Sequence, residues 1–138
     1  MATTEATRFV ERFSEVWRSP EPDAFAAFWH SDGKLFHPTM EEPIPSSEIP
    51  AYIGRVQEVL PDIRLRVRHW AAQGDVVFVE WTASATALSS PVSWDGVDRF
   101  TLHGERATEG VAYFDSAPLS AQLGQTAAPS DISRVSGR

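Results

Sequence analysis

The sequence predicts an α+β domain in which helices from the first half of the chain pack on one face of a curved sheet from the second half. Apolar residues recur at helical spacing up to residue 60 and then change to the alternation that is typical of strands. The length of 138 residues allows one domain with a core of its own. We expect an antiparallel or mixed sheet that forms a cone around the N-terminal helices, with an apolar cavity at its open end.

The first helix is predicted over residues 4–19. Thr4 can cap its start, Glu5 suits the positive end of the helix dipole, and Ser19-Pro20 ends it. One apolar stripe runs along this helix and consists of Ala6, Phe9, Val10, Phe13, Val16 and Trp17.

A shorter second helix is predicted over residues 24–30, with Asp23 as its N-cap and Gly33 as its exit. The residues that it would bury are Phe25, Phe28 and Trp29. A short strand over residues 35–37 follows and ends at Pro38, which removes a backbone donor.

The third helix is predicted to begin near Ser47, after a proline-rich loop over residues 41–47, and to end at Leu60 before Pro61. Pro50 belongs in its first turn, where a missing N–H does little harm. Its apolar face consists of Tyr52, Ile53, Val56, Val59 and Leu60.

Strands dominate the second half of the chain. Residues 63–70 alternate apolar residues with arginines, which indicates a strand with one face in water or against a partner. Residues 76–83 are apolar at nearly every position, which predicts a central strand covered on both faces. Residues 97–102 and 107–115 form a hairpin around a turn at residues 103–106.

Asp98 is the residue that points most clearly to function. The period of two along a strand places it on the same face as Phe100 and Leu102, so a carboxyl group points among buried apolar side chains. Such a group either finds a partner or has its pKa raised by desolvation and stays protonated, when it can donate a hydrogen bond as an acid. The strand therefore predicts a small-molecule pocket.

Composition limits the domain organisation and the partners. We expect residues 1–123 to form a single domain, and residues 124–138, which lack periodicity, to form a flexible tail or a dimer arm. The net charge of −7, with Lys34 as the single lysine, argues against nucleic-acid and anionic-membrane partners. An apolar sheet face predicts a homodimer.

The lack of cysteine excludes a disulfide, a thiolate nucleophile and a zinc–thiolate site, and it is in keeping with a reducing cytoplasm. The first residues lack a signal-peptide pattern, and no apolar run reaches the ~20 residues that span a bilayer. We therefore expect a cytoplasmic protein. The four histidines are scattered, so no metal site is predicted.

Several segments, taken in this order, resemble the SnoaL-like group of the nuclear-transport-factor-2-like superfamily. The resemblance spans residues 5–123 and rests on residues 35–38, 47–53, 60–65, 74–77, 96–100 and 113–115. It implies the cone-shaped fold of that superfamily and a dimer through the sheet. The superfamily includes polyketide cyclases, ketosteroid isomerases, limonene-epoxide hydrolases, dehydratases and proteins that only bind ligands.

The resemblance also implies roles for single residues. In ketosteroid isomerases a carboxylate base stands just before a proline in the first strand, and His37 before Pro38 looks like its counterpart. Asp98 looks like the match for the protonated acid of that family's oxyanion site. The tyrosine donor on the first helix corresponds to Phe13, which cannot donate a hydrogen bond.

Two other families of the group are compared in the same way. Limonene-epoxide hydrolases use an Arg and two Asp; Asp98 looks like one of them, but Gly96 and Ala112 occupy the other two places, which argues against that mechanism. Polyketide cyclases carry an aspartate base on the last strand, close to Asp115. Asp115 is thereby a third candidate catalytic residue.

Each candidate has a structural alternative. His37 could be a packed strand histidine, and Asp98 could be a structural carboxylate that bonds to a neighbouring strand or to a Trp N–H. For Asp115 we favour the alternative, a turn in which it accepts backbone hydrogen bonds. The other histidines are expected at a helix end, in the core and at a solvated hairpin tip, in the order His30, His69 and His103.

We expect large aromatic residues to line the pocket and bind the ligand: Phe13, Trp17, Phe28, Trp29, Tyr52, Trp81 and Trp94. The leading hypothesis is a cofactor-independent isomerase or cyclase that abstracts a proton next to the carbonyl of an apolar, polyketide- or steroid-like substrate. His37 would be the base, and protonated Asp98 would stabilise the enolate oxygen. The alternative is a noncatalytic ligand-binding or dimeric scaffold protein, which the absence of a donor at Phe13 favours.

Overall fold

The computed structural model of the protein describes residues 3–37 and 40–123. Helices and strands alternate along the first half, and long strands follow. The elements are α1 (Thr4–Arg18), the 3₁₀ helix η1 (Pro22–Phe28), β1 (Trp29–Phe36), β2 (Ile44–Pro45), the 3₁₀ helix η2 (Ser46–Glu48), α2 (Ile49–Val59), β3 (Arg64–Gln73), β4 (Val76–Ala87), β5 (Ser90–His103), β6 (Arg106–Phe114) and α3 (Ala117–Leu123).

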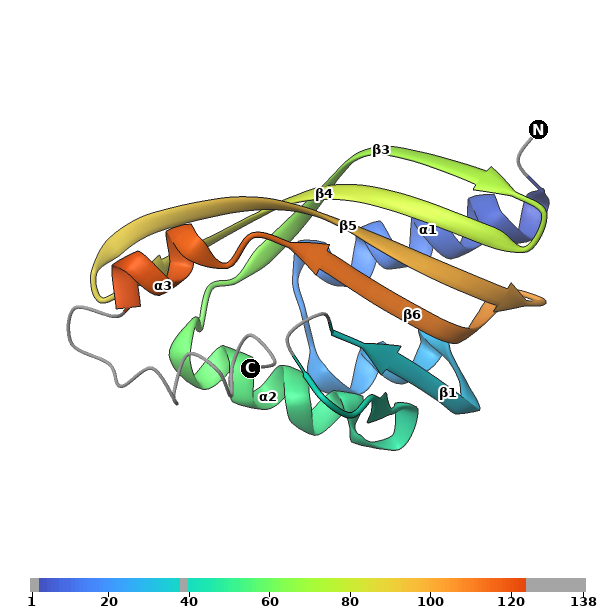
Figure 1. Cartoon of the computed structure of the whole chain (residues 1–138), viewed down its shortest axis with the longest axis horizontal. Helices are drawn as coiled ribbons and strands as arrows, with labels where there is room; N and C mark the ends of the chain where they lie inside the picture. The colour runs from blue at the N-terminus through green and yellow to red at the C-terminus, as the bar shows by residue number, and fades with distance from the viewer. Residues whose placement is uncertain (1–2, 38–39, 124–138) are drawn as a thin grey trace.

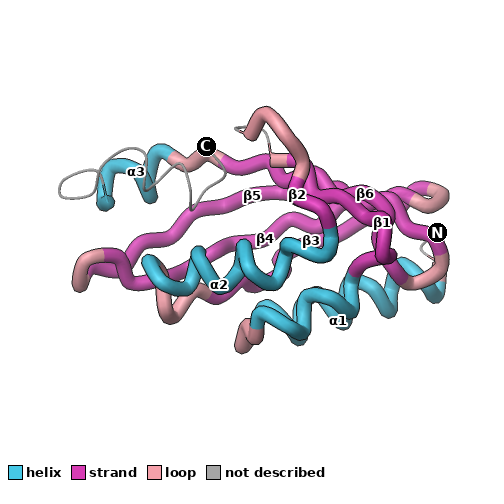
Figure 2. The backbone as a smooth tube through the Cα atoms, turned by 90° about the horizontal axis from the view of Figure 1, so that it is seen from below, coloured by secondary structure: helices cyan, strands magenta, loops and turns pink. Residues whose placement is uncertain are grey.

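One curved sheet of six strands holds the fold together. Its strand order is β2-β1-β6-β5-β4-β3, in which β1 runs parallel to β6 and the other neighbouring pairs are antiparallel. Helices α1 and α2 lie on the same face of the sheet (Figures 1 and 2). The predicted α+β class, with a curved mixed sheet around the N-terminal helices, is confirmed.

Helix α1 forms where its apolar stripe predicts it. Its cap is Thr3 rather than Thr4, because the Thr3 hydroxyl accepts a hydrogen bond from the Ala6 N–H at 3.0 Å. Phe9 and Phe13 are buried on the helix and pack against Phe100 of β5, with ring centroids 4.7 and 5.6 Å apart. These contacts attach the helix to the inner face of the sheet.

The segment predicted as a second α-helix differs. It is a 3₁₀ helix that begins one residue earlier than Asp23 and ends at Phe28, so Trp29 and His30 belong to β1. Long-range parallel pairing with β6 extends β1 to eight residues. Gly33 is part of this strand rather than a helix exit, and a Cβ there would lie 2.9 Å from the Trp29 ring.

The third predicted helix is confirmed over most of its length. A 3₁₀ turn occupies residues 46–48, and α2 begins at Ile49 with Pro50 in its first turn. The Leu60 N–H donates to the Val56 carbonyl oxygen at 2.9 Å and closes the last turn. Ile53 and Val56 are buried against the rest of the core, as the apolar face predicts.

A bulge changes the direction of one strand. In β3 the register shifts between Val67 and His69, which moves the following side chains to the other face of the sheet. The His69 side chain is 79% exposed and lies 3.9 Å from the Glu80 carboxylate. The prediction that His69 is packed in the core was therefore wrong.

Strand β4 is longer than predicted and is not covered on both faces. Its residues alternate between buried and exposed, and Phe78 is 43% exposed. A turn with positive φ at Leu88 and Ser89 joins it to β5, which begins at Ser90, seven residues before the predicted start. The hairpin of β5 and β6, with its turn at residues 103–106, is confirmed.

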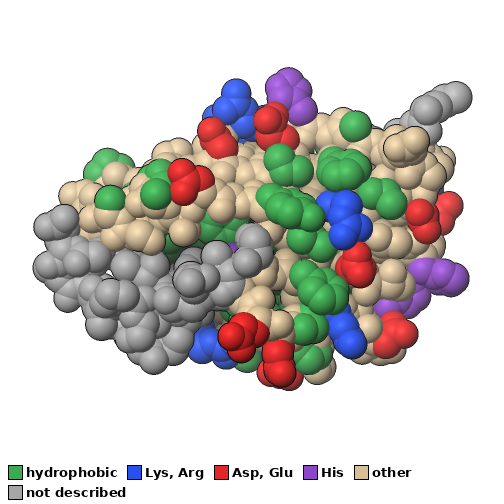
Figure 3. Space-filling view, in the orientation of Figure 1, with side chains coloured by type: hydrophobic (Ala, Val, Ile, Leu, Met, Phe, Trp, Pro, Cys, Tyr) green, Lys and Arg blue, Asp and Glu red, His purple; other side chains and the backbone are tan. Residues whose placement is uncertain are grey.

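The outer face of the sheet carries exposed aromatic residues. Cross-strand pairing places Phe78 opposite Arg99, Arg99 opposite Val111, and Val111 opposite Phe36. Tyr113 lies on the same face and is 49% exposed. Figure 3 shows hydrophobic side chains gathered on one face of the molecule among a few charged ones. We call Phe36, Phe78, Val111 and Tyr113 the outer apolar patch.

Helix α3 was not predicted. It begins just after Asp115, whose carboxylate accepts a hydrogen bond from the Ala117 N–H at 2.9 Å. Leu119 on this helix is buried to 2% exposure and contributes to the core. The predictions that concern Pro38 and the tail over residues 124–138 lie outside the described residues.

Candidate functional site

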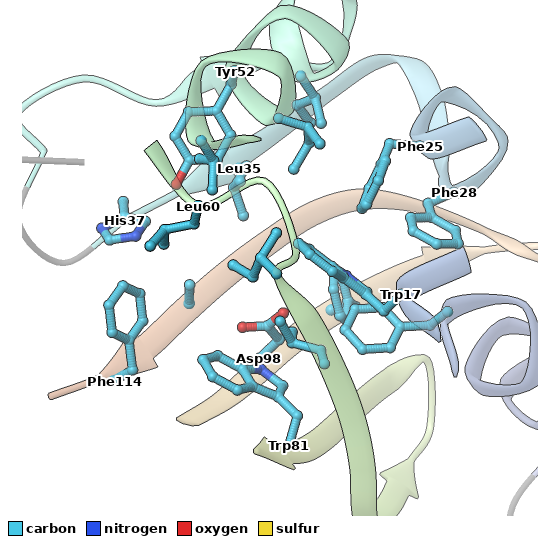
Figure 4. Close-up of a pocket in the computed structure, with 18 of the residues that line it drawn as sticks. Trp17, Phe25, Phe28, Leu35, His37, Tyr52, Leu60, Trp81, Asp98 and Phe114 are labelled. Atoms are coloured by element: carbon cyan, nitrogen blue, oxygen red, sulfur yellow. The ribbon is translucent and has the colours of Figure 1, made fainter. Parts of the chain in front are cut away.

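A cavity lies between the inner face of the sheet and the helices that cover it. Within it, the centre of a water-sized molecule can move through about 120 Å³. That is far more than the roughly 10–15 Å³ that one water needs, and it is close to the ~150 Å³ of an engineered cavity that binds benzene. Figure 4 shows that side chains from the strands and the helices converge on this space. A compound with a single ring is therefore a suitable occupant.

The walls of the cavity are almost entirely apolar. All seven aromatic residues that the sequence analysis proposed for a pocket line it, and so do Phe25, Phe100 and Phe114. Among the described lining residues, only His37, Tyr52 and Asp98 carry a titratable group. The cavity thus combines a hydrophobic wall with a few polar groups, as sites for small molecules commonly do.

Asp98 lies in the middle of β5 and points into the cavity. It is 8% exposed, and its Oδ1 atom has no hydrogen-bond partner among the described residues. Burial disfavours the charged form and raises the pKa of Asp98 to about 7, while the nearby Trp81 indole lowers it in part. Near neutral pH this carboxyl group can therefore be protonated and donate a hydrogen bond.

Trp81 stands beside Asp98 on the neighbouring strand. It pairs with Gly96 in the β4–β5 register, so Asp98 is its diagonal neighbour on the same face. The indole N–H is near enough to lower the pKa of Asp98, yet it does not reach hydrogen-bond geometry, and its Nε1 atom has no partner among the described residues. Both strands thus bring an unsatisfied polar atom to one part of the cavity.

His37 follows directly after β1 and is 6% exposed. Its ring contacts Phe114 edge-on, with ring centroids 4.9 Å apart. Burial disfavours the imidazolium form and lowers the pKa of His37 to about 4. The imidazole is therefore neutral at neutral pH, but it is a weaker base than a histidine with the ordinary pKa of about 6.5, which the sequence analysis assumed.

Tyr52 adds a hydroxyl group from α2. Burial, together with the nearby Asp98 carboxylate, raises the pKa of Tyr52 above its ordinary range, so the phenol stays protonated. In Figure 4 its hydroxyl oxygen points toward the side of the cavity where His37 lies. From the sequence, Tyr52 is expected only as part of the aromatic wall, and the contribution of its hydroxyl group to the cavity is not predicted.

The remaining candidates lie elsewhere. Asp115 is exposed, does not line the cavity, and accepts the Ala117 N–H, as the favoured structural alternative predicts. His30 lies on β1 instead of a helix end, and its Nε2–H donates to the His103 carbonyl oxygen at 2.8 Å. His103 is at the exposed hairpin tip as predicted. Phe13 lines the cavity with an apolar ring at 1% exposure.

Sequence reasoning missed much of the aliphatic wall. Residues from five elements or their connecting loops contribute to it, among them Leu35, Ile49, Leu60, Ile63 and Leu119. Leu119 lies on the unpredicted helix α3. The others follow apolar patterns that predict burial, but burial in a core and burial at a cavity give the same pattern. Only the packing of the helices on the sheet distinguishes these two cases.

Within residues 3–37 and 40–123, no group of three or more potential metal ligands comes together. No helix in those ranges is long and apolar enough to cross a membrane. The chemistry that the described cavity can support is proton transfer and hydrogen bonding by Asp98, His37, Tyr52 and Trp81.

Solved structures of similar fold include three that illustrate the range of the superfamily. IdmH from Streptomyces antibioticus, provisionally assigned as a polyketide cyclase, is 16% identical, with a TM-score of 0.75 over 86% of this chain and 98% of its own. A protein with a ketosteroid isomerase-like fold from Catenulispora acidiphila, solved with trimethylamine, is 17% identical, with a TM-score of 0.76 over 84% and 92%. TerC, crystallised with polyporic acid, is 21% identical, with a TM-score of 0.77 over 88% and 99%.

At such low identity these structures establish the fold alone. A comparison with curated proteins finds no match. The family described as the SnoaL-like domain matches residues 10–110, which include the C-terminal part of the first helix, most of the sheet, His37 and Asp98. The chain therefore belongs to the SnoaL-like domain family and has the nuclear-transport-factor-2-like fold.

Proposed function

We propose that the protein is a cofactor-independent enzyme of the isomerase or cyclase type that acts on an apolar carbonyl compound by proton abstraction. One observation carries this proposal: a buried carboxyl group, Asp98, with an unpartnered oxygen atom, shares an apolar cavity with a neutral histidine, His37. A domain gains no stability from such a carboxyl group. A reaction that needs a neutral acid in an apolar site explains its presence.

In the proposed step His37 is the base and Asp98 the acid. A C–H bond next to the carbonyl breaks, and its proton moves to the unprotonated nitrogen of the His37 ring. The electron pair forms the enolate, whose oxygen accepts a hydrogen bond from protonated Asp98. The imidazolium then returns the proton to another carbon. In a cyclisation, the enolate carbon instead attacks a second carbonyl carbon, whose C=O π bond breaks to give an alkoxide, and the imidazolium protonates this alkoxide. The hydrogen bond to the developing oxygen anion in an apolar cavity lowers the activation free energy by a few kcal/mol.

The weak basicity of His37 narrows the substrate class. A base with a pKa of about 4 accepts a proton efficiently only from an acidic C–H group. A carbon between two carbonyl groups supplies such a proton. We therefore favour a 1,3-dicarbonyl compound of the polyketide type over a steroid-like ketone, and the volume of the cavity suits a reacting portion about one ring in size.

A noncatalytic ligand-binding protein is the second candidate. Phe13 favours it, because an apolar ring stands where ketosteroid isomerases, by resemblance, have a tyrosine donor. In that case the cavity would bind an apolar compound, and Asp98 and His37 would only orient it. Turnover therefore has to be measured separately from binding.

The test is hydrogen–deuterium exchange at the carbon between the two carbonyl groups of the dione 2-acetylcyclohexanone, followed by NMR at pH 6. We expect the protein to accelerate exchange, and His37→Ala and Asp98→Asn to remove most of the acceleration. His69→Ala and Asp95→Asn are the controls, because these side chains are 79% and 69% exposed. Binding of the dione without acceleration, little changed by either cavity substitution, would favour the ligand-binding protein.

We also propose that a second copy of the chain covers the outer apolar patch. The patch extends over the outer face from β1 to β4, with its residues on β1, β6 and β4, and its apolar side chains are gathered and not scattered singly. Light scattering at micromolar concentration should give a dimer, and Phe78→Glu should give a folded monomer. A monomeric native protein would contradict this assignment.

A further inference from the structure

Trp81 carries a second buried polar group that the proposed reaction does not yet use. The side chain lies on β4, is 4% exposed and lines the cavity. Its Nε1–H group has no hydrogen-bond partner among the described residues, and the Oδ1 atom of Asp98 is in the same situation. A buried donor is seldom left unpaired, because its hydrogen bond to water is lost on folding.

The backbone is shaped to keep the indole in this position. Gly96 pairs with Trp81 across the two strands, and a Cβ at residue 96 would collide with the six-membered ring of the indole. The ring therefore lies directly over a residue without a side chain. Its nitrogen is thereby placed beside Asp98, as Figure 4 shows.

The two unpaired groups face one another without bonding. The indole N–H is close enough to Asp98 to lower the pKa of its carboxyl group as a hydrogen-bond donor does, but the two groups do not reach full hydrogen-bond geometry. An oxygen atom that enters between them can accept from both, since protonated Asp98 and the indole are each donors. Phe13, by contrast, has no group that could supply this second donor.

We infer that the Trp81 indole N–H and the Asp98 carboxyl group form a two-donor site that binds a carbonyl, enolate or phenol oxygen of the ligand. Trp81 thereby supplies the donor that Phe13 cannot. The inference rests on the proposed function for the role of Asp98 as a donor, but it does not depend on turnover. It makes the cavity selective for ring compounds that carry an oxygen acceptor over equally large hydrocarbons.

The test compares 4-methylphenol with toluene, which differ in one hydroxyl group. Calorimetry at pH 6 measures the affinity of both compounds for the native protein, Trp81→Phe and the control Trp94→Phe. We expect the native protein to prefer 4-methylphenol and Trp81→Phe to weaken its binding about three- to tenfold, the range for one lost hydrogen bond. Toluene binding should change much less. Trp94→Phe, which alters another cavity tryptophan, should affect both compounds alike.

Three results would overturn the inference: equal affinity of the native protein for both compounds, equal weakening of both by Trp81→Phe, or no effect of this substitution on 4-methylphenol. If Trp81→Phe does not fold, NMR of the ¹⁵N-labelled native protein replaces the affinity comparison. The Trp81 indole N–H signal should shift with 4-methylphenol and not with toluene, and a signal unmoved by both would contradict the inference. Absence of deuterium exchange, in contrast, would count against the proposed reaction and leave this oxygen site intact.

Discussion

The two faces of the central strands differ in whether their polar side chains have hydrogen-bond partners. On the outer face Arg99 donates to the Glu109 carboxylate at 3.0 Å, and Thr82 donates to the Asp95 carboxylate at 2.6 Å. On the inner face of the same strands Asp98 and Trp81 each keep a buried polar atom without a partner. Asp98 and Arg99 are adjacent in sequence, so the difference comes from the direction of the side chain and not from the region of the chain.

This contrast separates polar residues that serve the fold from those that serve a site. A paired group on a partly exposed face adds little to stability and is easily replaced. An unpaired group in an apolar cavity lowers stability, so its presence requires another explanation. We take the inner face as the functional one for this reason, and the following experiments test first the inner side and then the outer face of the sheet.

The largest effect is expected in the pH dependence of stability. Asp98 has a pKa of about 7 in the folded chain, above its ordinary 3.8, so its protonated form contributes stability at low pH that is lost as pH rises to about 7. Three pH units correspond to roughly 4 kcal/mol. Relative to the native protein, Asp98→Asn should therefore gain stability between pH 4 and pH 7. Urea unfolding at several pH values measures the difference.

His37 should show the opposite sign. Its pKa of about 4 in the folded chain lies below the ordinary 6.5, so stability is lost as pH falls from 6.5 toward 4, by roughly 3 kcal/mol. In the native protein the two contributions partly cancel. Relative to the native protein, His37→Asn should gain stability as pH falls over this window. If the free energy of unfolding depended on pH in the same way for both variants and the native protein, the assigned burial of these groups would be contradicted.

A smaller effect is expected from the glycine beneath Trp81. A Cβ at residue 96 would collide with the indole and lie 2.9 Å from the Phe114 Cβ, so Gly96→Ala should destabilise the fold by about 1–3 kcal/mol. Gly54→Ala is the matched control, because nothing lies within 4 Å of its new methyl group in α2. Alanine at residue 54 should raise the free energy of unfolding by at most ~1 kcal/mol. Equal unfolding midpoints for the two variants would mean that the indole is not held against residue 96.

The smallest effect is expected on the outer face. The side chains of the Arg99–Glu109 ion pair are 27% and 42% exposed, so solvent screens the pair. A double-mutant cycle with Arg99→Ala and Glu109→Ala should give a coupling of only about 0.2–1 kcal/mol. A coupling of several kcal/mol would show that the outer face also carries strongly coupled charges and would weaken the contrast between the faces.

The parts of the fold that the sequence predicts well are those with local patterns. The stripe on α1, the proline-bounded α2 and the β5–β6 hairpin each follow from residues close together in the chain. The errors arise where contacts with residues distant in the chain determine the secondary structure or the direction of a side chain. Parallel pairing with β6 converts Trp29 and His30 from helix to strand, and a bulge turns His69 outward. The turn at Leu88 and Ser89 lacks the Asn-Gly signal that usually accompanies positive φ.

The sequence predicts most residues of the candidate site that carry polar or aromatic side chains. It does not predict their pKa values or hydrogen bonds. Alternation along β5 placed Asp98 inward, and the structure puts His37 on the wall of the same cavity. The lowered pKa of His37 was not foreseen, because the degree of burial depends on how Phe114 and the helices pack around the ring. The unpaired Trp81 N–H was likewise invisible, since a tryptophan in a strand gives no sign of what its nitrogen meets.

The central claim, that neutral His37 is the base and protonated Asp98 the acid, is tested most directly by the pH profile of deuterium exchange on 2-acetylcyclohexanone, which stays un-ionised over the pH range used. The account predicts protein-catalysed exchange that is flat from about pH 5 to pH 6 and falls above about pH 7, as Asp98 loses its proton. Below about pH 4, protonation of His37 should abolish the protein-catalysed exchange as well. Exchange that instead rises through pH 7 would make ionised Asp98 the base, and no exchange at any pH would contradict the enzymatic role itself.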